Sequence, residues 1–116
     1  MKIRIKGNSL RYRLTRTDVE TFAKEGNLAE QTAFGSDVLT YVLLRSAGER
    51  LTATFKDNQI TVLMPAGMAD EWAHTERIGF ENVDSGLHLL IEKDFKCLDN
   101  VAEDQSDNYP NPLAKI

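Results

Sequence analysis

The chain has a single cysteine, Cys97, and no long hydrophobic run. One cysteine excludes an intrachain disulfide framework. A membrane-spanning helix needs about 18 consecutive apolar residues, and no stretch comes near that length. Met1 is not followed by the apolar segment of a signal peptide. These absences predict a cytoplasmic protein that does not contact membranes.

Proline is also scarce, and two of the three prolines, Pro110 and Pro112, lie close together near the C-terminus. Two prolines in three residues exclude a helix or a central strand there. Residues 94–116 also hold five acids and two bases without strong apolar periodicity. We therefore expect an extended acidic arm over 94–116, with Phe95, Leu98 and Tyr109 available to anchor it.

Acids are missing from the first sixteen positions, which hold six bases. Residues 17–93, by contrast, hold six bases and thirteen acids. The whole chain has a net charge of −4 and a pI of about 5.1. A basic segment thus stands out against an acidic body.

The chain contains one pattern twice, at a spacing of about fifty residues. The pair Phe22-Ala23 returns as Trp72-Ala73. Each copy predicts two strands, a helix and two further strands. We expect one duplicated α+β domain over residues 1–93, with units of about 1–45 and 50–93.

Each unit opens with alternating apolar and polar residues around a two-residue turn. The turns are Gly7-Asn8 and Asp57-Asn58, residue types that tolerate a left-handed backbone. The first turn predicts that Lys6 lies opposite Ser9. The second hairpin of each unit is expected to turn near Gly35 and Gly86.

The helix of each unit has terminal signals. Residues 17–20 have the spacing of a capping box, and Gly26 is placed as a C-terminal stop. Pro65 suits the first turn of the second helix. Phe22 and Trp72 fall at equivalent positions and should both be core residues.

We expect the two units to be related by pseudo-twofold symmetry and to combine their hairpins into one mostly antiparallel sheet or a partly closed barrel. The helices should cover an open side or end of it. The expected core residues are Val42, Leu44, Phe55, Ile60, Val62, Trp72, Leu89 and Ile91.

The register of the first hairpin places Arg4 opposite Arg11 and Lys2 opposite Arg13. Like charges in directly opposed positions destabilise a sheet. The matching positions of the second unit hold three threonines and a leucine, so the fold does not require this charge.

Two interpretations of these bases remain open. They are solvated surface paired with acids of the body or arm, or Lys2, Arg4, Arg11 and Arg13 form an anion-binding face for an acidic protein or a polyanion. Specific nucleic-acid binding is not expected, because the pI is acidic and no helix has a basic stripe. Tyr12, the one aromatic of the hairpin, alternates inward and offers no stacking platform.

The arm provides the residues for an alternative, enzymatic function. Glu103, Asp104 and Asp107 have the oxygen ligands that Ca²⁺ or Mg²⁺ prefers, without the spacing or central glycine of an EF-hand. Cys97 beside Lys96 is the candidate thiol nucleophile. No phosphate-binding glycine loop or Gly-x-Ser-x-Gly turn is present, and no cofactor is expected.

His74 and His88 are the other metal-ligand types, and with Cys97 they lack the paired spacing of a structural zinc site. We expect His74 to interact with the C-terminal end of the second helix. His88 should lie on the polar face of the last strand.

The opening KIRIKGNSLR, residues 2–11, and the closing EDQSDNYPNP, residues 103–112, together resemble a family of small bacterial proteins of unknown function. The resemblance covers most of the chain and implies no activity, substrate or catalytic residue.

The leading hypothesis is therefore a small, non-catalytic binding module with a basic hairpin face. Part of the acidic arm should dock near that hairpin and mask it. The alternative is a metal-dependent or thiol enzyme built on the arm and Cys97.

Overall fold

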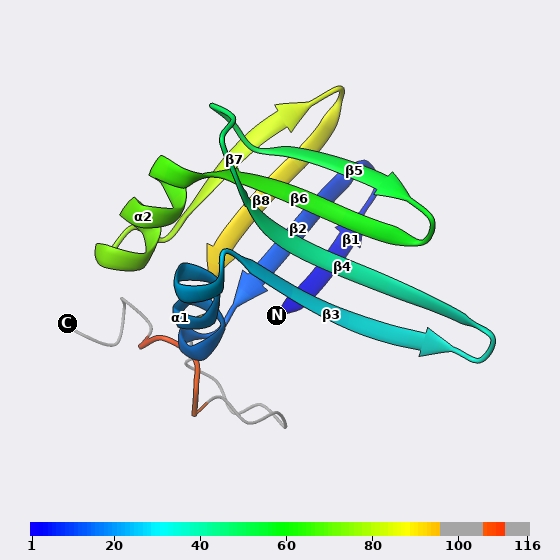
Figure 1. Cartoon of the computed structure of the whole chain (residues 1–116), viewed down its shortest axis with the longest axis horizontal. Coiled ribbons are helices and arrows are strands. Elements are labelled where there is room, and N and C mark those ends of the chain that lie inside the picture. The colour runs from blue at the N-terminus through cyan, green and yellow to red at the C-terminus, as the bar shows by residue number, and fades with distance from the viewer. Residues whose placement is uncertain (96–105, 111–116) are drawn as a thin grey trace.

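The computed structural model describes residues 1–95 and 106–110. Eight strands form two open four-stranded sheets, and two helices pack at one end of them (Figure 1). The first sheet has the order β1-β2-β8-β7 and the second β3-β4-β6-β5. The elements are β1 (Lys2–Lys6), β2 (Ser9–Leu14), α1 (Arg16–Glu25), β3 (Asn27–Phe34), β4 (Asp37–Ser46), β5 (Thr52–Lys56), β6 (Gln59–Pro65), α2 (Ala66–His74), β7 (Gly79–Asp84) and β8 (Leu87–Lys93).

Each sheet joins a hairpin from the first half of the chain to one from the second half. The hairpins themselves are antiparallel, and the central pairs β2–β8 and β4–β6 are parallel. The predicted α+β class is confirmed, and most pairings are antiparallel. The prediction of one continuous sheet or a partly closed barrel is wrong, because the helix of each half separates its two hairpins into different layers.

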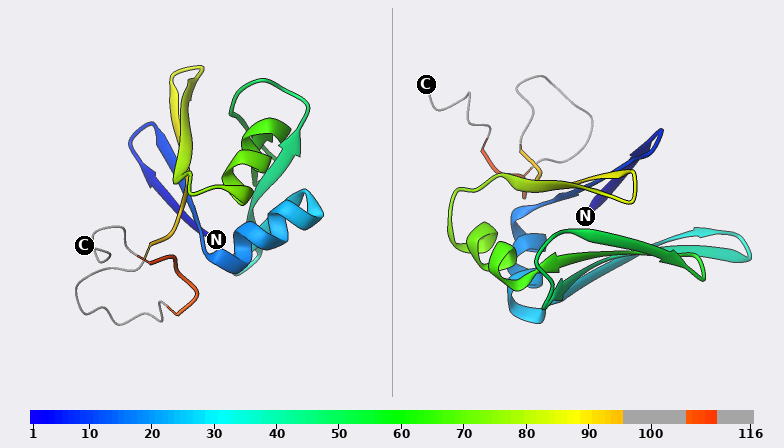
Figure 2. Two further views of the ribbon diagram at one scale, coloured as in Figure 1. Left: turned by 90° about the vertical axis from the view of Figure 1, so that its left-hand side faces the viewer. Right: turned by 90° about the horizontal axis from the view of Figure 1, so that it is seen from above.

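The two sheets lie as two layers, with the helices closing one end and the hairpin turns at the other (Figure 2). The inward positions of the strands and the two helices form a single core. Phe22 on α1 and Trp72 on α2 are 1% and 0% exposed, as predicted. Tyr12 donates a hydrogen bond from its hydroxyl to the Val42 carbonyl oxygen, 3.1 Å away, which ties β2 of one sheet to β4 of the other.

Three of the predicted core residues, Val42, Leu44 and Phe55, are not among the buried residues of the core. Tyr41 and Leu43 are the buried positions of β4, so Val42 and Leu44 face outward, and Leu44 is 38% exposed. Phe55 does face inward, but it lies near the turn end of β5, where the sheets are open, and is 68% exposed. The other five residues are buried as expected.

The two opening hairpins have the predicted two-residue turns and register. Lys6 lies opposite Ser9, and Lys56 lies opposite Gln59. Gly7 has a φ of 54°, which an L-residue adopts with strain. Turn 57–58 takes the same left-handed region with the tolerant pair Asp-Asn.

The start of α1 differs from the prediction by two residues. Thr15, and not Thr17, is the N-cap, and it exchanges capping-box hydrogen bonds with Asp18. Gly26 ends the helix in the left-handed conformation, as expected. None of the helices in the described part of the chain has the length and apolar character to cross a membrane.

Residues 106–110, here called the strap, pack where α1 begins and β8 ends. The Asp107 carbonyl oxygen accepts from the Arg16 amide at 3.0 Å, and the Tyr109 amide donates to the Asp94 carbonyl oxygen at 2.8 Å. The Tyr109 and Phe95 rings lie 5.8 Å apart. Part of the arm is therefore docked through two of the predicted anchors, and the third, Leu98, lies outside the described residues. The rest of the arm lies outside the described residues.

Candidate anion-binding face

The strand register sorts the outer side chains of the first sheet into rows. Opposed residues of neighbouring strands share a face, and the buried residues of β2 and β8 assign the remaining positions to the outside. From the turn end to the helix end, the rows are Lys6–Ser9–His88–Val83, Arg4–Arg11–Leu90–Glu81 and Lys2–Arg13–Glu92–Gly79.

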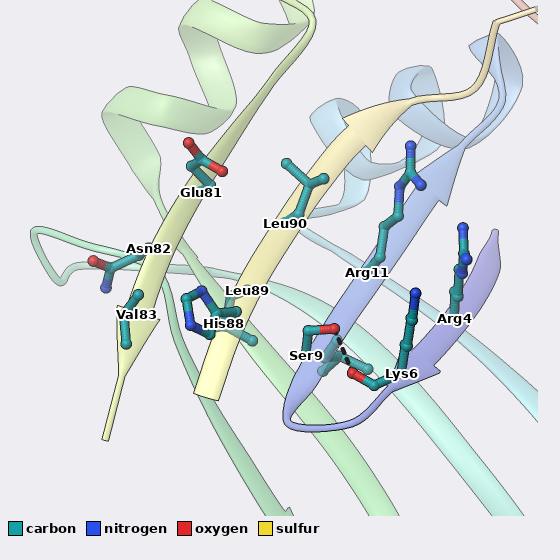
Figure 3. Close-up of a pocket in the computed structure, with 11 residues that line it drawn as sticks. Arg4, Lys6, Ser9, Arg11, Glu81, Asn82, Val83, His88, Leu89 and Leu90 are labelled. Carbon is teal, nitrogen blue, oxygen red and sulfur yellow. Dashed lines mark hydrogen bonds between the residues drawn. The ribbon is translucent and has the colours of Figure 1, made fainter. Parts of the chain in front are cut away.

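A hollow of about 710 Å³ lies over the first two rows. Figure 3 shows Arg4, Lys6 and Arg11 projecting from β1 and β2 along one side of it. Glu81 comes from β7 on the far side, and His88 lies between. Three of the four charged lining residues are basic, so the hollow favours an anion.

Glu92 on β8 is the counter-charge for two of the predicted bases. Its Oε1 atom accepts from the Nε atom of Arg11 at 2.7 Å and from the Nη2 atom of the same guanidinium. The Nε atom of Arg13 lies 3.2 Å from the same oxygen. One carboxylate thus orients two guanidinium groups, which compensates the like charges of the hairpin only in part.

Gly79 makes room for this arrangement on the neighbouring strand. A Cβ atom there would lie 2.2 Å from the Ile91 carbonyl oxygen and 2.8 Å from the Cβ atom of Glu92. Glycine therefore lets β7 approach β8 closely beside the carboxylate.

The three bases of β1 have different surroundings from those of Arg11 and Arg13. The Lys2 ammonium lies 3.1 Å from the Oδ2 atom of buried Asp94, an ion pair without hydrogen-bond geometry. Asp94 is the first residue of the acidic arm, so this pair joins the start of the arm to the hairpin. Across the described residues, no ion pair is recorded for Arg4 or Lys6, and both side chains are exposed.

The outer face of the second sheet is a natural control, because it has the same strand arrangement. Its outward positions hold mostly threonine, glutamine, alanine, valine and leucine, and Lys56 is the one charged residue among them. The basic character of the first sheet is therefore not a requirement of the architecture.

A second hollow of about 630 Å³ opens between the sheets at their turn ends. Its lining is mainly apolar and includes Leu10, Ile60 and the two exposed residues Ile5 and Phe55. The carboxylate of Asp84, the one ionisable side chain there, accepts the Ala53 amide at 3.1 Å. The one carboxylate of this cleft is thus already engaged by the backbone of β5.

Of the predicted metal and thiol residues, only Asp107 belongs to the described part of the chain. Glu103, Asp104 and Cys97 lie outside the described residues. Asp107 accepts the Thr17 hydroxyl at 2.8 Å. No group of three potential metal ligands occurs within residues 1–95 and 106–110.

The histidines lie where the sequence predicts. The His74 Nδ1 atom lies 2.9 Å from the Asp70 carbonyl oxygen in the last turn of α2, and His88 is on the outer face of β8.

Sequence reasoning missed Lys6, His88 and Glu92 as members of the basic face. Alternation with Leu89 and Ile91 does predict that His88 and Glu92 share one face of β8. The parallel pairing that places this face beside Arg11 has no local sequence signal.

No curated protein and no solved structure matches the chain. Over residues 1–113 the chain matches the Family of unknown function (DUF7009). The chain therefore belongs to this family, which confirms the resemblance to a family of unknown function.

Proposed function

We propose that the protein is a non-catalytic cytoplasmic binding module that docks an anionic partner on the outer face of the first sheet. The observation that carries this proposal is the concentration of Arg4, Lys6 and Arg11 around one hollow, in contrast to the single lysine on the equivalent face of the second sheet.

The three bases have complementary roles in this proposal. Arg11 is held in place by Glu92, so its guanidinium enters binding with part of its side-chain freedom already lost. Arg4 and Lys6 extend from the neighbouring strand β1 on the same side of the hollow and are exposed to water. Such exposed bases bind anions chiefly through screened charge attraction, so the affinity should fall steeply with salt.

The partner that suits this face is an acidic protein segment or a polyanion of repeating phosphate or sulfate groups. Base recognition is disfavoured, because Tyr12 is buried and no Phe, Tyr or Trp side chain lines the hollow. His88 and Ser9 add further hydrogen-bonding groups beside the bases. These groups suit phosphate, sulfate or carboxylate oxygens equally well.

The proposal includes an origin by internal duplication, with pseudo-twofold symmetry between the halves. It is supported by the element order, which is strand-strand-helix-strand-strand in each half. The parallel pairs β2–β8 and β4–β6 are further support, because each joins the second strand of one half to the last strand of the other. In this view the basic face was acquired by one half after duplication.

Backbone amide NMR with long-chain inorganic polyphosphate tests the binding site. We expect saturable shifts confined to β1, β2 and the facing part of β8, including Arg4, Arg11 and His88. Shifts centred on the second sheet, or spread evenly over all exposed lysines and arginines, would reject the proposed face.

A further inference from the structure

A buried lysine at the helix end of the molecule forms no ion pair with any acid of residues 1–95 and 106–110. Lys93, the last residue of β8, is 5% exposed. Its ammonium donates to the Thr75 carbonyl oxygen at 2.9 Å. Within the described ranges, no carboxylate lies within 4.0 Å of it. An ammonium has three donors and normally needs an anion when it is buried.

Two adjoining cavities meet at this lysine. One, of about 480 Å³, lies against Ile78, Phe95 and Pro110, and the other, of about 570 Å³, lies along α1 and the end of α2. Arg16, Thr75, Lys93 and Tyr109 line both cavities.

Tyr109 of the strap holds two cations near its ring. The Nζ atom of Lys93 lies 5.2 Å from the ring centroid, and the Cζ atom of Arg16 lies 5.5 Å from it. The aromatic ring offsets part of the cost of burying Lys93, but it supplies no negative charge. Burial accordingly lowers the pKa of Lys93, while the Glu76 carboxylate acts in the opposite direction.

We propose that the cavity between Lys93, Arg16 and Tyr109 binds a small organic carboxylate, whose oxygens take the place of the missing counter-ion. The planar guanidinium of Arg16 matches a carboxylate at the rim, and the ammonium of Lys93 meets it inside. The apolar wall of Ile78 and Phe95 takes the body of the ligand.

The surrounding charges favour a monoanion with an apolar body over free phosphate. Glu76 lines the first cavity, and Glu20 lines the second together with Lys24 and His74. The two carboxylates would repel the second charge of a phosphate dianion. The carboxylate site lies at the helix end of the first sheet, and the hollow lined by Arg4, Lys6 and Arg11 lies toward the turn end. The site is therefore independent of the proposed polyanion face.

The test is titration of the full chain with sodium benzoate, followed through the ¹³Cε and ¹Hε signals of ¹³C-labelled lysines. We expect saturable binding that shifts the Lys93 signals and raises the Lys93 pKa, because the bound carboxylate stabilises the ammonium. Inorganic phosphate should bind at least tenfold more weakly than benzoate.

Three variants keep the proposal falsifiable. K93M retains the length of the side chain and should abolish the saturable binding, and R16Q, at an exposed position, should weaken it at least tenfold. K56M removes an exposed charge from β5 of the second sheet, which lines neither cavity, and should leave the affinity unchanged. Unsaturable shifts, equal binding in R16Q, or tighter binding of phosphate than benzoate would overturn the proposal, even if K93M fails to fold.

Discussion

The rings of Phe22 and Trp72 meet edge to face, with centroids 6.4 Å apart and an interplanar angle of 67°. Phe22 comes from α1 and Trp72 from α2, so this contact joins the two helices directly over the core. The indole Nε1 atom of Trp72 also donates to the Ile78 carbonyl oxygen at 2.9 Å. This aromatic pair therefore contributes to the packing of both helices at the helix end of the molecule.

Truncating either ring should destabilise the whole domain. For Phe22→Ala or Trp72→Ala, we expect the free energy of unfolding to fall by about 3–5 kcal/mol, the usual loss for a large buried aromatic. Phe55→Ala is the control, and it should cost less than about 1 kcal/mol, because this ring is 68% exposed. Urea denaturation measures all three, and a loss at Trp72 as small as that at Phe55 would contradict the core assignment.

Tyr12→Phe should remove one polar link between the sheets at little cost to packing. The hydroxyl of Tyr12 donates to the Val42 carbonyl oxygen, and the expected loss of stability is about 1 kcal/mol. The Tyr41 hydroxyl lies 3.5 Å from the Met1 carbonyl oxygen, a weaker contact, so Tyr41→Phe should cost less. Equal losses in the two variants would show that the Tyr12 contact has no special role.

Burial raises the pKa of Tyr12 far above its usual value of 10. The unfolded chain therefore loses this proton at a lower pH than the folded chain does. The contribution of the protonated Tyr12 hydroxyl to folding stability is fully present below pH 10 and declines as the pH rises above 10. Tyr12→Phe should flatten this alkaline part of a stability curve measured by denaturant titration.

The strap should respond to acid through Asp107. Hydrogen bonds from the hydroxyls of Thr17 and Thr15 lower the pKa of this carboxyl below its usual 3.8. The ionised Asp107 carboxylate therefore contributes to docking fully above about pH 4. This contribution is lost as the pH falls through the lowered pKa that Asp107 has in the folded protein. We expect the NMR signals of Tyr109 to change in that range, and the change to be reduced in Asp107→Asn. An identical acid response in the variant would exclude Asp107 as its cause.

Local features of the fold were readable from the sequence. Gly7-Asn8 and Asp57-Asn58 predict their turns and registers, because few residue types accept a left-handed backbone. The burial of Phe22 and Trp72 is predicted correctly, because a large aromatic on the apolar face of an amphipathic helix packs into the core. The burial of Leu44 was mispredicted because an apolar residue on a strand does not reveal which face is the core.

The pairing between the halves could not be predicted. Apolar and polar residues alternate along β2 and β8 in the same way whether these strands pair with each other or with different neighbours. The local sequence therefore does not reveal the parallel register that places Arg11 beside Leu90. The partnership of Glu92 with Arg11 and Arg13 follows from that register and was missed with it. Charge composition did identify the basic hairpin, since charge needs no knowledge of topology.

Removing the internal counter-charge should strengthen the proposed face. Glu92→Gln preserves a hydrogen-bond acceptor for Arg11 but frees positive charge for a partner. We expect polyphosphate to bind about twofold to fivefold more tightly, equivalent to the ~0.5–1 kcal/mol of a partly exposed ion pair. Glu49→Gln, in the exposed loop after β4, changes the net charge equally and should have little effect. The same gain in both variants would indicate a nonspecific response to net charge.

The salt dependence of polyphosphate binding tests the central claim most directly. The measurement compares the wild type with the double variant R4Q/K6Q and the charge-matched control K24Q/K56Q, where Lys56 holds the turn position of the second sheet that Lys6 holds in the first. We expect R4Q/K6Q to weaken binding at low salt and to reduce the slope of log Kd against log salt by about one for each base removed. The control should retain the wild-type affinity and slope. Equal affinity and slope in R4Q/K6Q and the wild type would contradict the proposal that this face binds anionic partners.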